Sequence, residues 1–191
     1  AEAAKRGLSV PSLADMEEIE ISNRLYREDG RDYMTAILPG QTMDRQQASM
    51  PVTFIIGSGR LVTVRHHAPR PFETFPTRAD KSSTGCDSAN HIFLGLIEEI
   101  LGRQADLLEA VGRALDASSR QVFVGDATQK PAVLQDALVL IGAQGEVLSR
   151  VRLGLMTLER ALAYYSQTLG EGADTRTVRA QAKARLRDLQ A

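Results

Sequence analysis

Residues 52–65 read VTFIIGSGRLVTVR and predict two antiparallel β-strands joined by a tight turn. Both halves are rich in β-branched side chains, and the glycines of the link Gly57-Ser58-Gly59 permit the backbone angles that a hairpin turn requires. On the N-terminal side, residues 33–38 form another β-rich run, which we expect to end at Pro39-Gly40. The three runs predict a small antiparallel sheet.

Helical patterns flank these strands. Residues 11–28 begin with Pro11-Ser12 and have acidic side chains in their first turn, which is typical of a helix start, and Glu28-Asp29-Gly30 predicts a turn after them. Three prolines between residues 66 and 76 prevent regular strand pairing, although a short helix can begin near Pro71. We therefore expect the sheet to end before that proline-rich stretch.

Two long helices are predicted from Ser88 onward, where leucine and alanine are abundant and Pro131 is the only proline. A heptad-like seam runs along the first helix through Leu94, Ile97, Leu101, Gln104, Leu108, Val111 and Leu115. The second pattern begins at Lys130 and includes Leu134, Ala137, Ile141, Gln144, Leu148, Val151, Leu155, Leu158, Leu162, Tyr165 and Leu169. If the second helix is continuous, it is roughly 60 Å long, and the two would pack as an antiparallel hairpin.

The predicted fold class is α+β, with a mainly antiparallel sheet flanked by helices and a long antiparallel helical hairpin. We expect the sheet part in residues 1–80, incomplete at its N-terminus, and the hairpin in residues 81–170. A further helical stretch lies in residues 171–191, after a break at Gly170-Glu171-Gly172, and it is rich in arginine and lysine.

Composition excludes several classes of protein. The 191 residues contain 23 Lys plus Arg and 24 Asp plus Glu, so the chain lacks the basic excess expected of a nucleic-acid-binding protein. Its single cysteine, Cys86, cannot form an internal disulfide, which favours a cytosolic setting. There is no uninterrupted run of about 18 apolar residues of the kind that spans a bilayer.

The acidic set Asp15, Glu17, Glu18 and Glu20 is the main candidate for binding chemistry. Carboxylate oxygens are the ligands that Mg²⁺ and Ca²⁺ prefer, and these side chains lie within one and a half helical turns. The alternative interpretation is favourable electrostatics at a helix start. One helix alone would bind such an ion weakly, because it cannot supply six oxygens.

Other residues favour structural interpretations. His66, His67 and His91 lack the repeated spacing of a structural zinc site, and Cys86 has no visible oxyanion arrangement for a hydrolase. The Gly57-Ser58-Gly59-Arg60 segment joins two strands and does not open a helix, so we expect a turn there and no phosphate cradle. The basic residues between Arg176 and Arg187 lack interleaved aromatics and are interpreted as a solvated helix face or a surface near a membrane.

The order of these parts resembles the cytoplasmic domain of CorA-type magnesium and cobalt transporters, including their ZntB-like zinc relatives. The resemblance lies in the segments VPSLADMEEIE (10–20), SNRLYRE (22–28), DYMTA (32–36), PVTFII (51–56), LVTVR (61–65) and LSRVR (148–152), with Leu155 and Leu158-Glu159-Arg160. The family's Gly-Met-Asn signature loop is absent from this sequence. The resemblance implies no catalysis. It implies a regulatory domain of a divalent-cation transporter, which faces the cytoplasm at the inner membrane.

The resemblance also implies a homopentamer in which the last helix begins a stalk that leads to membrane helices after Ala191. It implies that Mg²⁺ or another divalent cation binds between neighbouring subunits and holds the pore shut. One family ligand follows the proline that matches Pro11, where the nearest counterpart is Met16, flanked by Asp15 and Glu17. Asp15 and Glu17 are therefore the expected metal ligands. The rival hypotheses are a soluble oligomerising α+β scaffold without an ion role, and a hydrolase based on Cys86.

Overall fold

The structure, a computed structural model, describes residues 8–123, 131–170 and 173–190. Its N-terminal part contains helices α2 (Leu13–Glu17) and α3 (Ile21–Arg24), then strands β1 (Leu25–Glu28), β2 (Arg31–Gln41), β3 (Gln47–Gly57) and β4 (Arg60–Arg65). Helix α4 (Pro71–Thr74) and the 3₁₀ turns η1 (Phe75–Thr77) and η2 (Ala79–Lys81) lead to the long helices α5 (Ala89–Phe123) and α6 (Pro131–Thr168), followed by α7 (Ala173–Gln190). The predicted α+β class is confirmed.

The sheet has the strand order β1-β2-β3-β4, and every neighbouring pair is antiparallel. The predicted hairpin at residues 52–65 is confirmed by β3 and β4, which pair up to Gly57 and Arg60. Between them, Ser58 and Gly59 have φ angles of 52° and 71°. Positive φ at both central residues is the requirement of a type I′ turn, whose twist matches that of the strands.

Strand β2 runs past Pro39-Gly40, where it was expected to end, and β3 includes Pro51. Pro39 pairs with Ser49, and Pro51 pairs with Ile37. The Ile37 N–H donates to Thr157 Oγ1 on α6 and so points away from β3, and Pro39 lies two residues further along the same strand. The prolines therefore occupy positions at which a missing N–H removes no β2–β3 hydrogen bond, and the prediction that β2 ends at Pro39-Gly40 is wrong.

The single helix expected over residues 11–28 is wrong. Ser12 and Asp15 start α2 with a capping box, but Glu18 is extended and α3 ends at Arg24. Residues 25–28 form β1 because they pair with residues 31–34, and the Tyr26 ring stacks on Tyr33 with their centroids 4.6 Å apart. A continuous helix would forfeit this pairing and would place several carboxylates three residues apart on one face.

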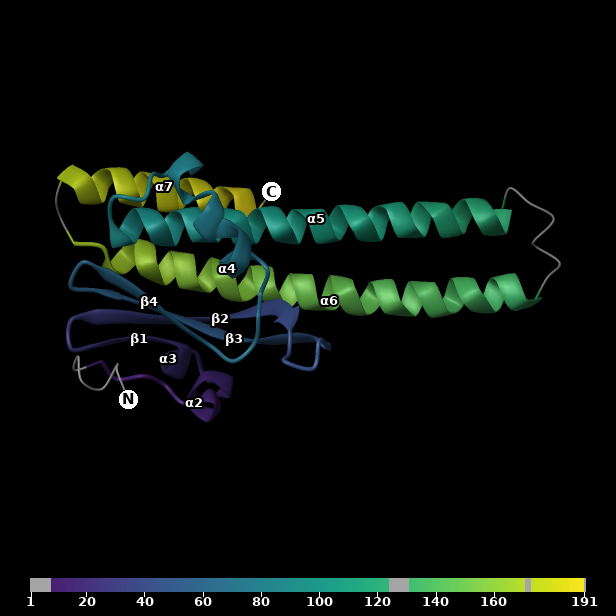
Figure 1. The fold of residues 1–191 in the computed structure, drawn as a ribbon, viewed down its shortest axis with the longest axis horizontal. Helices are drawn as coiled ribbons and strands as arrows, with labels where there is room; N and C mark the ends of the chain where they lie inside the picture. The colour runs from purple at the N-terminus through teal and green to yellow at the C-terminus, as the bar shows by residue number, and fades with distance from the viewer. Residues whose placement is uncertain (1–7, 124–130, 171–172, 191) are drawn as a thin grey trace.

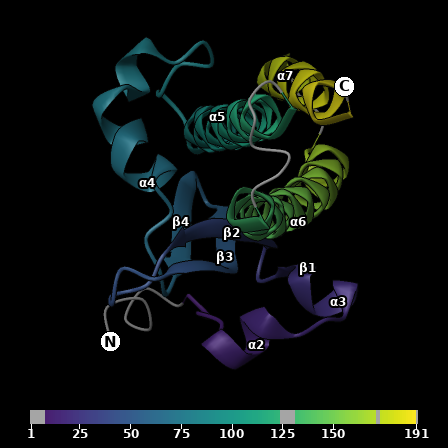
Figure 2. The same ribbon diagram turned by 90° about the vertical axis from the view of Figure 1, so that its right-hand side faces the viewer.

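The sheet lies between two layers of helix (Figures 1 and 2). Helices α5 and α6 cover one face, the short helices α2 and α3 lie on the other side, and α7 packs on the α5–α6 pair away from the sheet. Phe93 of α5 contacts Phe54 of β3 and Tyr165 of α6 edge-on, with ring centroids 5.4 and 4.8 Å apart. The core extends from the sheet through both long helices to α7.

Helix α6 lies close to both α5 and β2 at Gly154. A Cβ atom there would lie 2.9 Å from Gln104 Nε2 of α5 and 3.2 Å from the Ile37 carbonyl oxygen. One turn further on, Thr157 Oγ1 accepts the Ile37 N–H at 2.9 Å. Thr157 thus accepts one N–H on the outer edge of β2 beyond the end of β1, where no strand of the described residues pairs with it.

The distal halves of α5 and α6 extend beyond the sheet and pack on each other (Figure 1). Part of the predicted seam is wrong there, because Leu108, Leu134, Ile141 and Leu148 are exposed. On distal α6, the half-buried positions are residues 133, 137, 140, 144 and 147, so the predicted pattern is right at Ala137 and Gln144 and wrong at the three exposed residues of α6. The distal half of α6 is apolar on two adjacent faces, so periodicity alone does not identify the buried one.

Helix α6 is also long and apolar enough to cross a membrane by length and composition, and none of its apolar window is buried. Asp136 and Glu146 interrupt the apolar residues of this window, so the sequence contains no uninterrupted apolar run there. The C-terminal half of the same helix lies in the core through Leu158, Ala161 and Leu162. The apolar window therefore lies on the exposed distal half of α6, apart from the half that packs in the core.

Candidate functional site

The predicted acidic site lies on α2 and the segment that follows it. Asp15 Oδ2 accepts hydrogen bonds from the Ser12 backbone N–H at 2.8 Å and from the Ser12 hydroxyl at 2.7 Å, while the Asp15 N–H donates to Ser12 Oγ at 3.2 Å. The Ser12 hydroxyl and then the Ser12 N–H hold the Asp15 pKa below its usual value. Asp15 is therefore ionised at neutral pH, and one of its oxygens is already engaged.

The other acidic residues of this segment are exposed, and within the part of the chain that the structure describes only the Glu18 side chain has a hydrogen-bond partner. Glu18 Oε2 accepts from Asn23 Nδ2 at 2.8 Å, and Glu17 and Glu20 point into solvent. Across the described residues 8–123, 131–170 and 173–190, no group of three or more His, Cys, Asp or Glu side chains could hold a metal ion. A divalent cation at α2 would need further ligands from outside this set.

The histidines occupy separate environments. His67 is buried, and its Nε2 donates to the Leu38 carbonyl at 2.9 Å, while burial lowers its pKa despite that hydrogen bond. Gly40 makes room for this arrangement, because a Cβ there would lie 2.6 Å from the His67 ring. His67 therefore has a structural role where the chain leaves the sheet, whereas the adjacent His66 is exposed.

Cys86 and His91 lie near the start of α5. Cys86 is exposed, and His91 Nδ1 donates to Asp87 Oδ1 at 2.6 Å, which lowers the pKa of that carboxyl. Among the described residues, no hydrogen bond joins His91 to Cys86. The predicted turn at Gly57-Ser58-Gly59-Arg60 lies elsewhere, at the β3–β4 hairpin.

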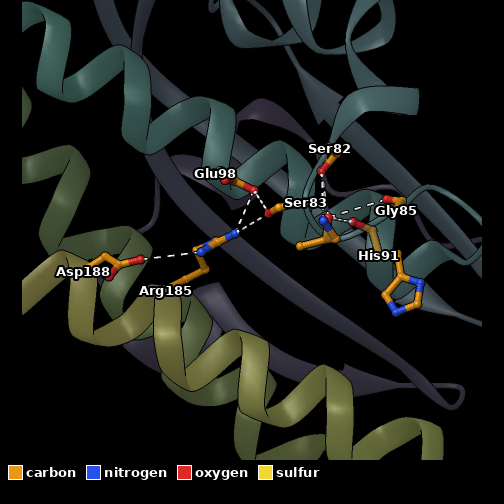
Figure 3. Close-up of polar contacts among 8 residues, drawn as sticks. Ser82, Ser83, Gly85, His91, Glu98, Arg185 and Asp188 are labelled. Carbon is orange, nitrogen blue, oxygen red and sulfur yellow. Dashed lines mark hydrogen bonds and ion pairs between the residues drawn. The ribbon is translucent and has the colours of Figure 1, made fainter.

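The arginines of α7 were interpreted as a solvated face, but two of them attach the helix to the rest of the domain. Arg185 Nη2 donates to Glu98 Oε2 at 2.7 Å and to Ser83 Oγ at 2.9 Å, and its Nη1 lies 3.6 Å from Asp188 (Figure 3). Arg179 donates to the carbonyls of residues 169 and 170 just after α6. The expectation of a purely solvated face is therefore wrong for these two residues.

The loop that carries Ser83 is itself fixed by buried hydroxyl groups. Thr84 Oγ1 donates to the His91 carbonyl at 3.1 Å and lies 2.9 Å from Ser82 Oγ (Figure 3). A Cβ at Gly95 would lie 2.8 Å from Ser82 Oγ, so the glycine allows the loop to lie against α5. The Arg185 contact therefore joins α7 to a rigid part of the domain. The spacing of the arginines in the sequence could not predict this contact, because Glu98 and Ser83 are 87 and 102 residues away from Arg185.

Comparison with known families gives one match over the whole chain. The model of the family described as "CorA-like Mg2+ transporter protein" matches residues 1–191. The magnesium transport protein CorA of Pectobacterium atrosepticum is 27% identical over 158 residues, which cover 83% of this chain and 49% of that protein. The protein of the same name from Haemophilus influenzae is 26% identical over 158 residues, with the same two coverages. The chain spans about half the length of these curated relatives.

Solved structures with the same fold include two soluble domains. The ZntB cytoplasmic domain from Vibrio parahaemolyticus has a TM-score of 0.60 at 12% identity, covering 99% of this chain and 75% of that chain. The soluble domain of CorA from Methanocaldococcus jannaschii has a TM-score of 0.55 at 12% identity, covering 99% and 76%. At this level of identity, the likeness concerns the fold alone.

Proposed function

Because the chain belongs to the family of CorA-like Mg²⁺ transporter proteins, we propose that it is the regulatory domain of a divalent-cation transporter. The family match over residues 1–191 is the observation that carries this proposal. Members of the family are transporters and not enzymes, so a hydrolytic role for Cys86 is excluded. The name of the relatives, magnesium transport protein, favours Mg²⁺ as the transported ion, with Co²⁺ and Zn²⁺ as the alternatives to test.

We further propose that the domain faces the cytoplasm and that the pore lies in the inner membrane, in the part of the relatives that this chain does not span. Helix α7 would be the start of the stalk that leads to this pore. The Arg185–Glu98 contact supports this role, because it ties α7 to the folded domain and so lets a change in the domain reach the helix. The full assembly would be a homopentamer.

Regulation would follow from a cation site between neighbouring domains, with Asp15 and Glu17 as ligands from one subunit. The exposure of Glu17 leaves its carboxylate available, and Asp15 keeps its second oxygen free of the Ser12 contacts. Ions that bind the closed assembly more tightly than the open one shift the equilibrium toward closure. Loss of the ions would then favour opening.

Calorimetry with Mg²⁺, Co²⁺ and Zn²⁺ tests the site. We expect micromolar to millimolar binding that is lost when Asp15→Asn and Glu17→Gln are combined, because the two negative charges are removed. The fold should be unaffected, since both amides keep the side-chain shape and the amide oxygen at position 15 can still accept from Ser12. Asp116→Asn, at an exposed position on α5 away from α2, is the matched control and should bind like the unmodified protein. Equal binding by the double variant and the control would contradict the proposed ligands.

Transport itself requires the full-length protein. We expect liposomes containing it to take up Mg²⁺ down a concentration gradient, as reported by an enclosed Mg²⁺-sensitive dye. Uptake that stays at the level of empty liposomes with Mg²⁺, Co²⁺ and Zn²⁺ would contradict the transporter proposal.

An oligomerising scaffold is the second candidate, because Leu134, Leu138, Ile141 and Leu148 expose apolar surface on distal α6. Light scattering after gel filtration distinguishes the two proposals. A regulatory domain should change its oligomeric state when Mg²⁺ replaces EDTA, whereas a scaffold without an ion role should have the same mass in both buffers.

A further inference from the structure

A cavity of about 640 Å³ lies between the middle of α5 and the segment from α4 to Ser83, on a different side of the domain from α2. Its volume falls within the range of roughly 300–1,000 Å³ that is typical of small-molecule sites. One wall is the α5 face that includes Gly95, Gly102 and Arg103. None of the residues that the family resemblance singles out lines this cavity.

Three cationic side chains converge on the cavity from three parts of the chain. Arg70 precedes α4, Lys81 ends η2, and Arg103 lies on α5. Among the ion pairs of the described residues, none involves these three side chains. Positive charge without a carboxylate partner is therefore concentrated around one hollow, which favours an anionic ligand.

Two of the carboxylates that also line the cavity are already neutralised by neighbours. Glu99 Oε1 accepts from the Thr74 hydroxyl at 2.6 Å and lies 3.5 Å from Arg78 Nη1. Glu98 is held by Ser83 and Arg185. The remaining carboxylate of the lining, Asp106, is exposed, so the unpaired cations outnumber it.

We propose that this cavity binds a small polyphosphate anion, either free or as part of a nucleotide. Guanidinium groups bind phosphate through two parallel hydrogen bonds, and a lysine ammonium binds it as a point charge. A ligand must carry several negative charges to reach Arg70, Lys81 and Arg103 together. Pro71 and Phe75 supply an apolar patch in the same cavity, on which the base of a nucleotide can lie.

The proposed site adjoins the anchor of α7. Ser83 and Glu98 line the cavity and also hold Arg185 (Figure 3). Arg185 Nε is buried without a hydrogen-bond partner, so the guanidinium has unused donor capacity beside the cavity. An anion bound there changes the electrostatic environment of the Glu98–Arg185 pair, and its binding is thereby coupled to the docking of α7.

Calorimetry in EDTA with ATP, tripolyphosphate and AMP tests the proposal. We expect binding of ATP or tripolyphosphate to be at least about tenfold weaker in Gly102→Leu, because a Cβ at Gly102 meets nothing within 4 Å and the added side chain enters the cavity. Gly112→Leu is the matched control, since Gly112 lies on the same helix, has the same open surroundings and is outside the cavity. Binding by this control should equal that of the unmodified protein.

A charge-matched pair separates specific binding from general attraction to a basic surface. Arg103→Gln should weaken binding at least about fivefold, whereas Arg113→Gln, at an exposed arginine paired with Glu109, should leave it unchanged. Tighter binding of ATP than of tripolyphosphate would identify a nucleotide site, and the reverse would identify a free polyphosphate site; AMP should bind more weakly than either.

Two results would overturn the proposal: no binding of ATP or tripolyphosphate at about 5 mM, or equal losses in Gly102→Leu and Gly112→Leu. EDTA removes divalent cations from the measurement. A failure here therefore leaves the cation site at α2 untouched, and a failure of that site leaves this proposal untouched.

Discussion

His67 is the residue whose protonation should matter most to stability above pH 5. Burial lowers its pKa below the ordinary value of about 6.5, so the unfolded chain takes up the proton first as pH falls. Stability contributed by neutral His67 is thus complete above about pH 7 and is lost as pH falls through about 6.5. We expect the urea midpoint to fall between pH 7 and 5 in the unmodified protein.

Two variants assign this pH dependence. His67→Gln should flatten it, whereas His66→Gln, at the exposed neighbouring residue, should not. The lowered carboxyl pKa values of Asp15 and Asp87 affect the stability of the fold only at lower pH. The stability that these ionised carboxylates contribute is lost as pH falls below about 4. An unchanged slope in His67→Gln would show that the buried histidine is not the titrating group.

The role of a residue could be predicted from the sequence where it depends on neighbours a few positions away. It could not be predicted where it depends on contacts with residues far away in the chain. The start of α2 was expected from Pro11-Ser12 and the acidic first turn, because a cap involves residues within one turn of each other. The contact of Arg185 with Glu98 could not be expected, since helical periodicity places a side chain on a face without saying what that face touches. The metal-ligand role of Asp15 and Glu17 stays a prediction for the same reason.

At the scale of elements, the junction of α6 with β2 includes one buried hydrogen bond, from the Ile37 N–H to the Thr157 hydroxyl group. Thr157→Val should destabilise the fold by about 1–3 kcal/mol, because it leaves the buried Ile37 N–H without an acceptor. Thr157→Ser retains the acceptor and should cost less. Urea unfolding measures both changes, and amide hydrogen exchange at Ile37 should accelerate in the valine variant. Equal stabilities of the two variants would argue against this role for the hydroxyl.

The elements themselves were predictable to different degrees. The β3–β4 hairpin and the two long helices follow from local signals, namely a glycine-rich turn and sustained helical composition. Strand β1 was missed because its four residues are stabilised by pairing with β2 and by the stacking of Tyr26 on Tyr33. Such tertiary contacts override the helical tendency of residues 25–28.

At the scale of the whole molecule, stability should differ between the two ends of the helical hairpin. The proximal halves of α5 and α6 are packed against the sheet and α7. Of the described residues, the distal halves contact mainly each other, and they expose several large apolar side chains. Hydrogen exchange should therefore be faster in residues 112–123 and 131–150 than in residues 93–100 and 158–165.

The variant Gly142→Ala tests whether local stability differs between the distal and proximal halves of the hairpin. It adds a methyl group in open space and should stabilise distal α6 by about 0.5–1 kcal/mol. Exchange of the distal amides should slow while that of the proximal amides stays the same. Uniform exchange along α5 and α6 would contradict the expected gradient.

The close packing at Gly154 fixes α6 at one point in the core, and the distal half of the helix projects from that point. Pro131 lies 23 residues away along α6, or about 35 Å at 1.5 Å per residue. A tilt of about 5° at Gly154 therefore carries the far end of the helix roughly 3 Å. Because Gln104 and the Ile37 carbonyl oxygen set the spacing at Gly154, they limit how far α6 can tilt there, and with it how far the tip of the hairpin can move.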